Sequence, residues 1–379
     1  MGGNAFNEIS DDQQPLRIVR LEASEYVALR QRILEILQMH FGQCICPIEA
    51  PDKVDHGDID ILVAHPKHEY SINDLSDWLG GARHKQNGDL CHFAVPRPES
   101  QDVHVQVDVL LCKDNIEWYA FMHSYGDVWN ILGTVLRAHG LTATNTGFYV
   151  RIEEEEKRNK KEARFFLSDD PRSVMIFLGL DADEYHQGIK TEQRLFEWLL
   201  HCRFVTATVF SRSPETADDR RRRARPMFAR FVVWNAAQLD KVDSELQPSR
   251  DQTLAKALTY FGQEEIFQRK LQQVRREVSE DKARILIVTR LVSMGFKQDK
   301  ANLVARGLKR WTSLEDQQLR VLDHAQMQQE SQVQLADLLD TAGDGLQPQY
   351  MVWICDHCEH VKSLEKGRMK VAKSLRAGA

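Results

Sequence analysis

The chain has 379 residues and a formal net charge of −6, and 42% of its residues are hydrophobic while 28% are charged. This balance excludes a disordered chain and a protein coated with basic charge for nucleic acid, and favours a soluble globular protein of about two or three domains. No apolar run approaches the roughly 18 residues of a membrane span, so no membrane partner is expected. Seven cysteines are too few for a disulfide scaffold, which indicates a reducing intracellular compartment, the cytoplasm or the nucleus.

The first part of the chain mixes helical and strand patterns. Apolar side chains recur at helical spacing in residues 22–41, 72–80 and 127–138. Short apolar or alternating runs predict strands at residues 56–64, 91–95 and 103–111, and a strand pair over residues 141–152. Pro96 and Pro98 indicate a hairpin loop between the second and third of these strands. The pattern predicts an α+β domain over residues 1–152, built on a mixed or antiparallel sheet.

Helical patterns dominate the rest of the chain. A charge run over residues 153–161 carries little apolar surface and indicates a domain boundary. Helices are expected at residues 171–179, 191–204, 226–239, 251–277, 281–294 and 298–311. We therefore expect a mostly helical domain over residues 165–345, followed by a basic C-terminal tail over residues 346–379.

Two carboxylates share one side of the 56–64 strand. Asp58 and Asp60 are two residues apart, so they project from the same face while Ile59 and Ile61 pack on the other. Like charges this close in an apolar strand resist joint ionisation unless something neutralises them. Hard oxygen ligands suit Mg²⁺, which takes one or two carboxylates together with substrate phosphates. The pair therefore predicts a divalent-cation site.

A third carboxylate lies in the alternating strand 103–111. The valines of this strand point to one side and its polar residues, Asp108 among them, point to the other. If this strand pairs beside the earlier one, Asp58, Asp60 and Asp108 converge on one patch. Three acids can hold two metal ions about 3.5–4 Å apart, where one activates an attacking hydroxyl and the other stabilises a leaving phosphate.

These segments carry a family resemblance. Gly57-Asp58-Ile59-Asp60-Ile61-Leu62-Val63 and Val105-Gln106-Val107-Asp108-Val109 resemble the nucleotidyltransferase superfamily that includes DNA polymerase beta, poly(A) polymerases and CCA-adding enzymes. More closely, the Gly-Gly-Asn-Ala start and the Gly-Asp-Ile-Asp strand resemble uncharacterised fungal and phage-type nucleotidyltransferase-like proteins. The resemblance covers residues 1–150; the remainder resembles only the same uncharacterised proteins.

The resemblance implies a reaction and its residues. It makes Asp58, Asp60 and Asp108 catalytic ligands of Mg²⁺ or Mn²⁺, with Asp108 also accepting or positioning the proton of the attacking hydroxyl. It implies transfer of a nucleoside monophosphate from a nucleoside triphosphate such as ATP, with release of pyrophosphate. The acceptor is left open among RNA, a protein and a small molecule, as is the oligomeric state.

One part of the superfamily pattern is missing. The superfamily usually has Gly-Ser or Gly-Gly roughly ten residues before the first aspartate, where backbone N–H groups hold the triphosphate. Here that stretch is Pro47-Ile48-Glu49-Ala50-Pro51. Candidate replacements for nucleotide binding are Gly2, Gly3, Asn4, Gly57 and Lys53, with Arg17 and Arg20 as further phosphate partners. A frayed chain end is the alternative for Gly2 and Gly3, and Glu49 is either an extra ligand or a surface acid.

Simpler interpretations remain beside the catalytic one. His104 and Gln106 either support Asp108 or only line a cleft. Cys355 and Cys358 have half of a zinc site's spacing, and a second ligand pair at the usual distance is missing. Two rival functions are a non-catalytic relative that binds nucleotide or RNA through the same cleft, and a scaffold whose basic tail binds RNA.

Overall fold

The computed structural model describes residues 3, 5–6, 16–98, 100–113, 115–206, 209–210, 220, 222–238, 248–328 and 331–377. The chain divides into two compact units, one formed by residues 1–152 and 164–264, the other by residues 153–163 and 265–379. The charge run therefore belongs to the second unit, and the first unit resumes after it. Residues 165–345, expected as one helical domain, are divided between the two units.

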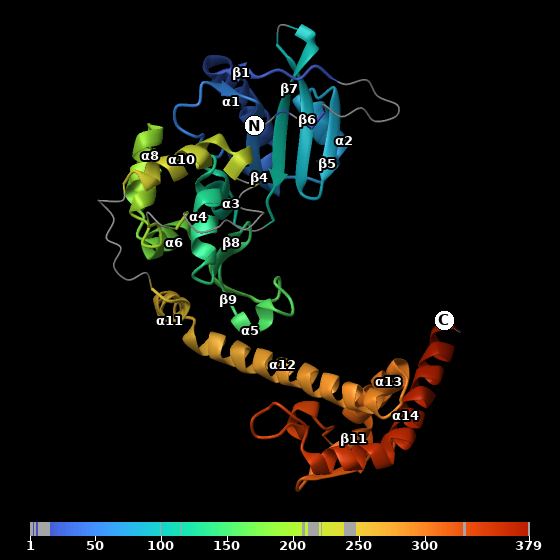
Figure 1. Ribbon diagram of the computed structural model, residues 1–379. Coiled ribbons are helices and arrows are strands. Elements are labelled where there is room, and N and C mark those ends of the chain that lie inside the picture. Colours follow the sequence, from blue (N-terminus) through green and yellow to red (C-terminus); the bar gives the residue numbers. More distant parts are fainter. Residues whose placement is uncertain are drawn as a thin grey trace. The chain divides into compact units, whose positions relative to one another are not determined.

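The first unit contains a five-stranded mixed sheet, called the central sheet below (Figure 1). Its strands lie in the order β2 (Phe41–Ile45), β4 (Asp58–Pro66), β7 (Ser100–Leu111), β6 (Leu90–Arg97) and β5 (Arg83–Asn87). Strands β4 and β7 run parallel, and the other neighbours in this sheet run antiparallel. The predicted hairpin is the pair β6 and β7. Of the two sheet types expected, mixed and antiparallel, the mixed one is confirmed.

Three helices flank this sheet: α1 (Ala23–His40), α2 (Ile72–Leu79) and α3 (Ile116–His123). Helices α1 and α2 pack on one face, against fully buried side chains such as Ile59, Ile61 and Val107. Helix α3 packs on the other face, where it contacts Leu62 and Ala64 near the end of β4. Because side chains alternate along a strand, Asp58 and Asp60 lie on this second face, beside α3.

The first unit also contains a smaller antiparallel sheet. That sheet contains β10 (Arg164–Ser168), β9 (Gly147–Arg151) and β8 (Leu141–Thr144), and a two-stranded ribbon joins β1 (Leu21–Glu22) to β3 (Asp55–His56). The remaining helices are α4 (Val128–Arg137), α6 (Pro171–Leu178), α7 (Ala182–Gln187), α8 (Glu192–Leu200), α10 (Pro226–Ala236) and α11 (Arg250–Phe261). The strand pair expected over residues 141–152 is confirmed as β8 and β9.

The second unit is mostly helical. Its elements are α5 (Glu153–Glu156), α12 (Glu264–Ser293), α13 (Gln298–Trp311), β11 (Thr312–Glu315), β12 (Gln318–Val321), η1 (Gln326–Gln328), η2 (Leu335–Leu338) and α14 (Pro348–Ala377). The expected basic tail is thus a 30-residue helix, and Ile354 and Val361 from it are fully buried against α12 and α13. Arg368 pairs with the buried carboxylate of Glu365 at 2.7 Å, so part of the tail's positive charge is used inside the unit.

The structure differs from the predicted helices at two boundaries. The helix expected over residues 251–277 is two helices, because Gly262 adopts the left-handed conformation (φ 63°) and ends α11. The break expected between residues 277 and 281 does not occur, and α12 continues through it. A glycine at a helix end costs little, so here the local cap outweighed the apolar periodicity.

The crossing of α13 and α14 depends on a glycine. A Cβ atom added at Gly307 would lie 2.6 Å from Val361 Cγ1 and 2.9 Å from the Val361 carbonyl oxygen. We expect Gly307→Ala to destabilise the second unit by about 1–3 kcal/mol, because the helices must separate. Gly367→Ala is the matched control, since nothing lies within 4 Å of its added Cβ and alanine favours the helix by about 1 kcal/mol. Amide hydrogen exchange of peptides from α13 and α14 should become faster in Gly307→Ala and slower in Gly367→Ala. Equal changes in the two variants would contradict this packing.

Candidate metal centre

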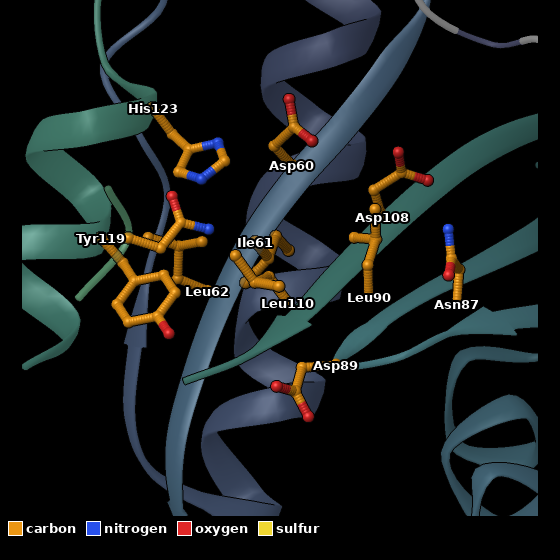
Figure 2. A pocket seen from close by; sticks show the side chains of 11 residues that line it. Asp60, Ile61, Leu62, Asn87, Asp89, Leu90, Asp108, Leu110, Tyr119 and His123 are labelled. Atoms are coloured by element: carbon orange, nitrogen blue, oxygen red, sulfur yellow. The ribbon is translucent and has the colours of Figure 1, made fainter. Parts of the chain in front are cut away.

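Three carboxylates meet on the second face of the central sheet. In the parallel register of β4 and β7, Asp60 lies directly beside Asp108 and Asp58 beside Gln106. Oxygen atoms of Asp58, Asp60 and Asp108 lie within 4.8 Å of one another. Figure 2 shows the Asp60 and Asp108 carboxylates rising from neighbouring strands toward the same side. The predicted convergence of the three side chains is confirmed.

The three carboxylates differ in exposure, but the surrounding protein raises the pKa of each. Asp108 is buried, Asp58 is half-buried, and Asp60 is open to the adjoining cavity. Desolvation by the surrounding protein, followed by the charges of Asp58 and Asp108, raises the pKa of Asp60 to about 8. Burial also raises the pKa of Asp58 and of Asp108. A group of acids that resists ionisation in this way is suited to binding a cation, because a divalent ion removes the repulsion.

Asp108 is the most firmly held of the three. The His92 ring Nδ1 lies 2.8 Å from Asp108 Oδ1, and the Gln106 amide donates to both carboxylate oxygens at 2.9 and 3.0 Å. His92 is brought there by the hairpin register, which pairs it with Asp108. Hydrogen bonds of this kind orient a ligating carboxylate and keep it ready for a metal. Of the two alternatives left open for Gln106, the structure shows hydrogen bonds to Asp108; the His104 backbone pairs with Arg17 and Val19.

A cavity of about 340 Å³ adjoins Asp60 and Asp108. Strand residues line one side, and Tyr119 and His123 of α3 line another, with Asn145 also at its wall. In Figure 2 the His123 ring lies across from Asp60, while Asp89 lies at the opposite end of the pocket. The volume falls within the range of about 300–1,000 Å³ typical of small-molecule sites.

Gly3 lies against the strand that begins with Asp58. It is buried, its φ is +81°, and an added Cβ would lie 2.5 Å from the carbonyl oxygen of Gly57. The glycines at positions 3 and 57 therefore touch beside the carboxylates, so the frayed-end alternative is wrong for Gly3. Gly2 and Asn4 lie outside the described residues.

The cationic candidates for phosphate binding are mostly engaged elsewhere. Lys53 donates to Glu49 at 2.6 Å, and the exposed Arg20 pairs with Asp55 at 2.9 Å. Arg17 is exposed.

Glu49 is neither a ligand of the carboxylate group nor a free surface acid. It also accepts a hydrogen bond of 2.5 Å from the Tyr26 hydroxyl. Burial opposes ionisation of Glu49, but the bonds from Lys53 and Tyr26 lower its pKa overall. Its charge therefore neutralises Lys53, which argues against Lys53 as an independent phosphate partner.

Sequence reasoning missed His92, Tyr119 and His123. The partner of Asp108 across the hairpin depends on the register, and the register shifts between Pro96 and Arg97, so counting back from the loop does not identify His92. The helix α3 that supplies Tyr119 and His123 was not expected at all, since its apolar residues surround it without a helical stripe. Only the run of aromatic residues between Trp118 and Phe121 signals a buried element there.

The described residues place the cysteine pair on a helix. Cys355 and Cys358 lie on α14, where the buried Cys358 donates to the Cys355 carbonyl at 3.1 Å. In the part of the chain that the structure describes, the aspartates at 58, 60 and 108 are the one group of three or more potential metal ligands that meets. No described helix combines the length and the apolar character that crossing a membrane requires.

No family model matches the chain, and no curated protein matches it.

Proposed function

We propose that the first unit is a metal-dependent nucleotidyltransferase. It moves a nucleoside monophosphate from a nucleoside triphosphate to a hydroxyl acceptor and releases pyrophosphate. The observation that carries the proposal is the placement of Asp58, Asp60 and Asp108 on adjacent parallel strands with their oxygens within 4.8 Å. Hard oxygen ligands of this number and spacing fit Mg²⁺ or Mn²⁺.

The three aspartates have different roles in the proposed transfer. When bound, the divalent ions supply charge neutralisation at the triphosphate and acidify the acceptor hydroxyl. Asp58, Asp60 and one oxygen of Asp108 would hold the ions against the strands. Asp108, fixed by His92 and Gln106, orients the acceptor and takes up its proton as the new oxygen–phosphorus bond forms and the bond to pyrophosphate breaks.

The adjoining cavity fits the nucleoside. Tyr119 and His123 present ring surfaces there, and Asn87 and Asn145 present amides, which are the groups that stack on a base and bond to its edge. The buried Gly3 beside Gly57 places backbone next to the carboxylates, where a triphosphate would lie.

A nucleotide-binding relative without catalysis is the second candidate. Lys53 is neutralised by Glu49 at 2.6 Å, and the stretch 47–51 has no glycine to form an N–H cradle. These two observations predict weaker triphosphate binding than the proposed transferase needs.

Turnover and binding assays separate the two candidates. We expect pyrophosphate release when the protein is incubated with labelled triphosphates, Mg²⁺ or Mn²⁺ and mixed RNA, protein and small-molecule acceptors. Asp58→Ala should abolish that release, whereas Asp77→Ala, an exposed position on α2, should leave it unchanged. Calorimetry should show Mg²⁺-dependent triphosphate binding that Asp60→Ala weakens. Binding without turnover supports the second candidate, and no binding of any of the common triphosphates contradicts both.

A further inference from the structure

The segment around Gly3, Ala5 and Phe6 contacts both carboxylate-bearing strands. Gly3 packs on Gly57, immediately before Asp58 in β4. The Ala5 backbone N–H donates to Gln106 Oε1 on β7 at 2.9 Å. The Lys85 ammonium on β5 donates to the Ala5 carbonyl at 2.7 Å and lies 5.6 Å above the Phe6 ring. Phe6 itself is only 1% exposed, so the segment is fixed to the unit by burial as well as by hydrogen bonds.

Gln106 joins this segment to the metal centre. Its side chain is 3% exposed, and its two ends face different partners: Oε1 faces the Ala5 N–H, and Nε2 faces both oxygens of Asp108. An amide turned the other way would place its oxygen against the Asp108 carboxylate and its NH₂ against the Ala5 N–H. Both contacts would then be repulsive, because an acceptor would face an acceptor and a donor a donor. Ala5 and Asp108 therefore select the same orientation of the amide.

The hydrogen bonds leave a defined ligand oxygen on Asp108. His92 and Gln106 both lie at hydrogen-bond distance from Oδ1, whereas among the described residues Oδ2 has Gln106 alone, at 3.0 Å. A carboxylate oxygen can accept two hydrogen bonds, so Oδ2 keeps the freer lone pair for a cation. The orientation of that lone pair depends on the Gln106 amide, and through it on the segment bound by Ala5.

We propose that Gln106 is a positioning residue and that the segment bearing Gly3, Ala5 and Phe6, acting through it, sets the cation affinity of the aspartate centre. This inference rests on the proposed function only in taking that centre as a metal site. Loss of groups that orient metal ligands costs about 10- to 100-fold in affinity. We expect Gln106→Met, which keeps the volume and removes the hydrogen bonds to Ala5 and to both Asp108 oxygens, to weaken Mn²⁺ binding by about 10-fold or more. Phe6→Ala, which releases the segment without touching the aspartates, should weaken it in the same direction by a smaller factor.

Mn²⁺ titration followed by electron paramagnetic resonance tests the coupling. Gln43→Met is the matched control, because Gln43 is exposed on β2 of the same sheet. Gln106→Glu distinguishes positioning from packing: it places a carboxylate against Asp108, so its Mn²⁺ affinity should depend on pH more steeply than that of Gln106→Met. If Asp60→Asn abolishes Mn²⁺ binding while Gln106→Met and Phe6→Ala bind like wild type, the coupling is refuted and the metal centre stands. If the wild-type protein binds no Mn²⁺, the centre and the coupling are both refuted.

A second readout needs no metal. With glutamine side chains labelled by ¹⁵N, the amide resonance that disappears in Gln106→Met is assigned to Gln106. In the wild-type protein its protons should exchange slowly with solvent, since they are buried and bonded to Asp108. Phe6→Ala should shift that resonance and speed its exchange. An unshifted, equally protected resonance would overturn the proposed link between the segment and Asp108.

Discussion

Asp60→Asn should abolish nucleotidyl transfer and at the same time stabilise the metal-free protein. Activity falls because metal ions supply several kcal/mol of transition-state stabilisation, and a loss of about 4 kcal/mol corresponds to roughly 10³-fold in rate. Stability rises because Asp60, which has its pKa raised to about 8 by desolvation and by two neighbouring acids, is replaced by a neutral side chain of the same shape. A merely structural aspartate would give the opposite sign of stability change.

The measurement is a pair of assays on the same samples. Pyrophosphate release is measured with Mg²⁺, and urea unfolding is measured in a chelator above about pH 8, where Asp60 is ionised and repels its neighbours. Asp77→Asn on α2 serves as the control, since it changes the same net charge at an exposed site. An Asp60→Asn protein that is active, or that is less stable than wild type without metal, would contradict the account.

Without a divalent metal, the stability contributed by Asp60 should fall as the pH rises. The unfolded carboxyl ionises near its ordinary pKa of 3.8, whereas the folded one ionises at about 8. The folded state therefore retains a proton that the unfolded chain has released. This contribution is complete below about pH 4 and is lost as the pH rises through about 8. Saturating Mg²⁺ should reverse the trend, because the ion replaces the proton and binds best to ionised ligands.

The quantity to measure is the difference in unfolding free energy between wild type and Asp60→Asn. Burial lowers the pKa of His104 and of His123, and these groups act in the opposite direction, but they are common to both proteins. In a chelator, the wild-type protein should lose stability relative to Asp60→Asn between about pH 5 and about pH 8. A difference that does not change with pH would show that Asp60 ionises as an ordinary surface acid.

Local patterns were enough to predict the chemistry-bearing strands. The apolar residues around Asp58 and Asp60 and the alternation around Asp108 follow from the period of two in a strand, which also fixes the shared face. In the sequence analysis, the pairing of β4 with β7 is only the condition under which the three carboxylates converge. The structure confirms their pairing, while metal occupancy and the transferase reaction stay predictions.

Contacts between side chains outside a local pattern could not be predicted from the sequence. The link from Ala5 through Gln106 to Asp108 spans about a hundred residues, and no local pattern specifies which buried glutamine meets which backbone group. The pairing of His92 with Asp108 depends on an irregular hairpin register. The ion pair of Lys53 with Glu49 argues against Lys53 as an independent phosphate partner.

The most direct test of the central claim is a crystal structure of the protein soaked with Mn²⁺, with an anomalous difference map collected at the manganese edge. We predict density between the carboxylates of Asp58, Asp60 and Asp108, resolving into two ions about 3.5–4 Å apart when a non-hydrolysable triphosphate is also bound. A map with no peak in contact with these three side chains, at Mn²⁺ concentrations that saturate binding in solution, would contradict the account.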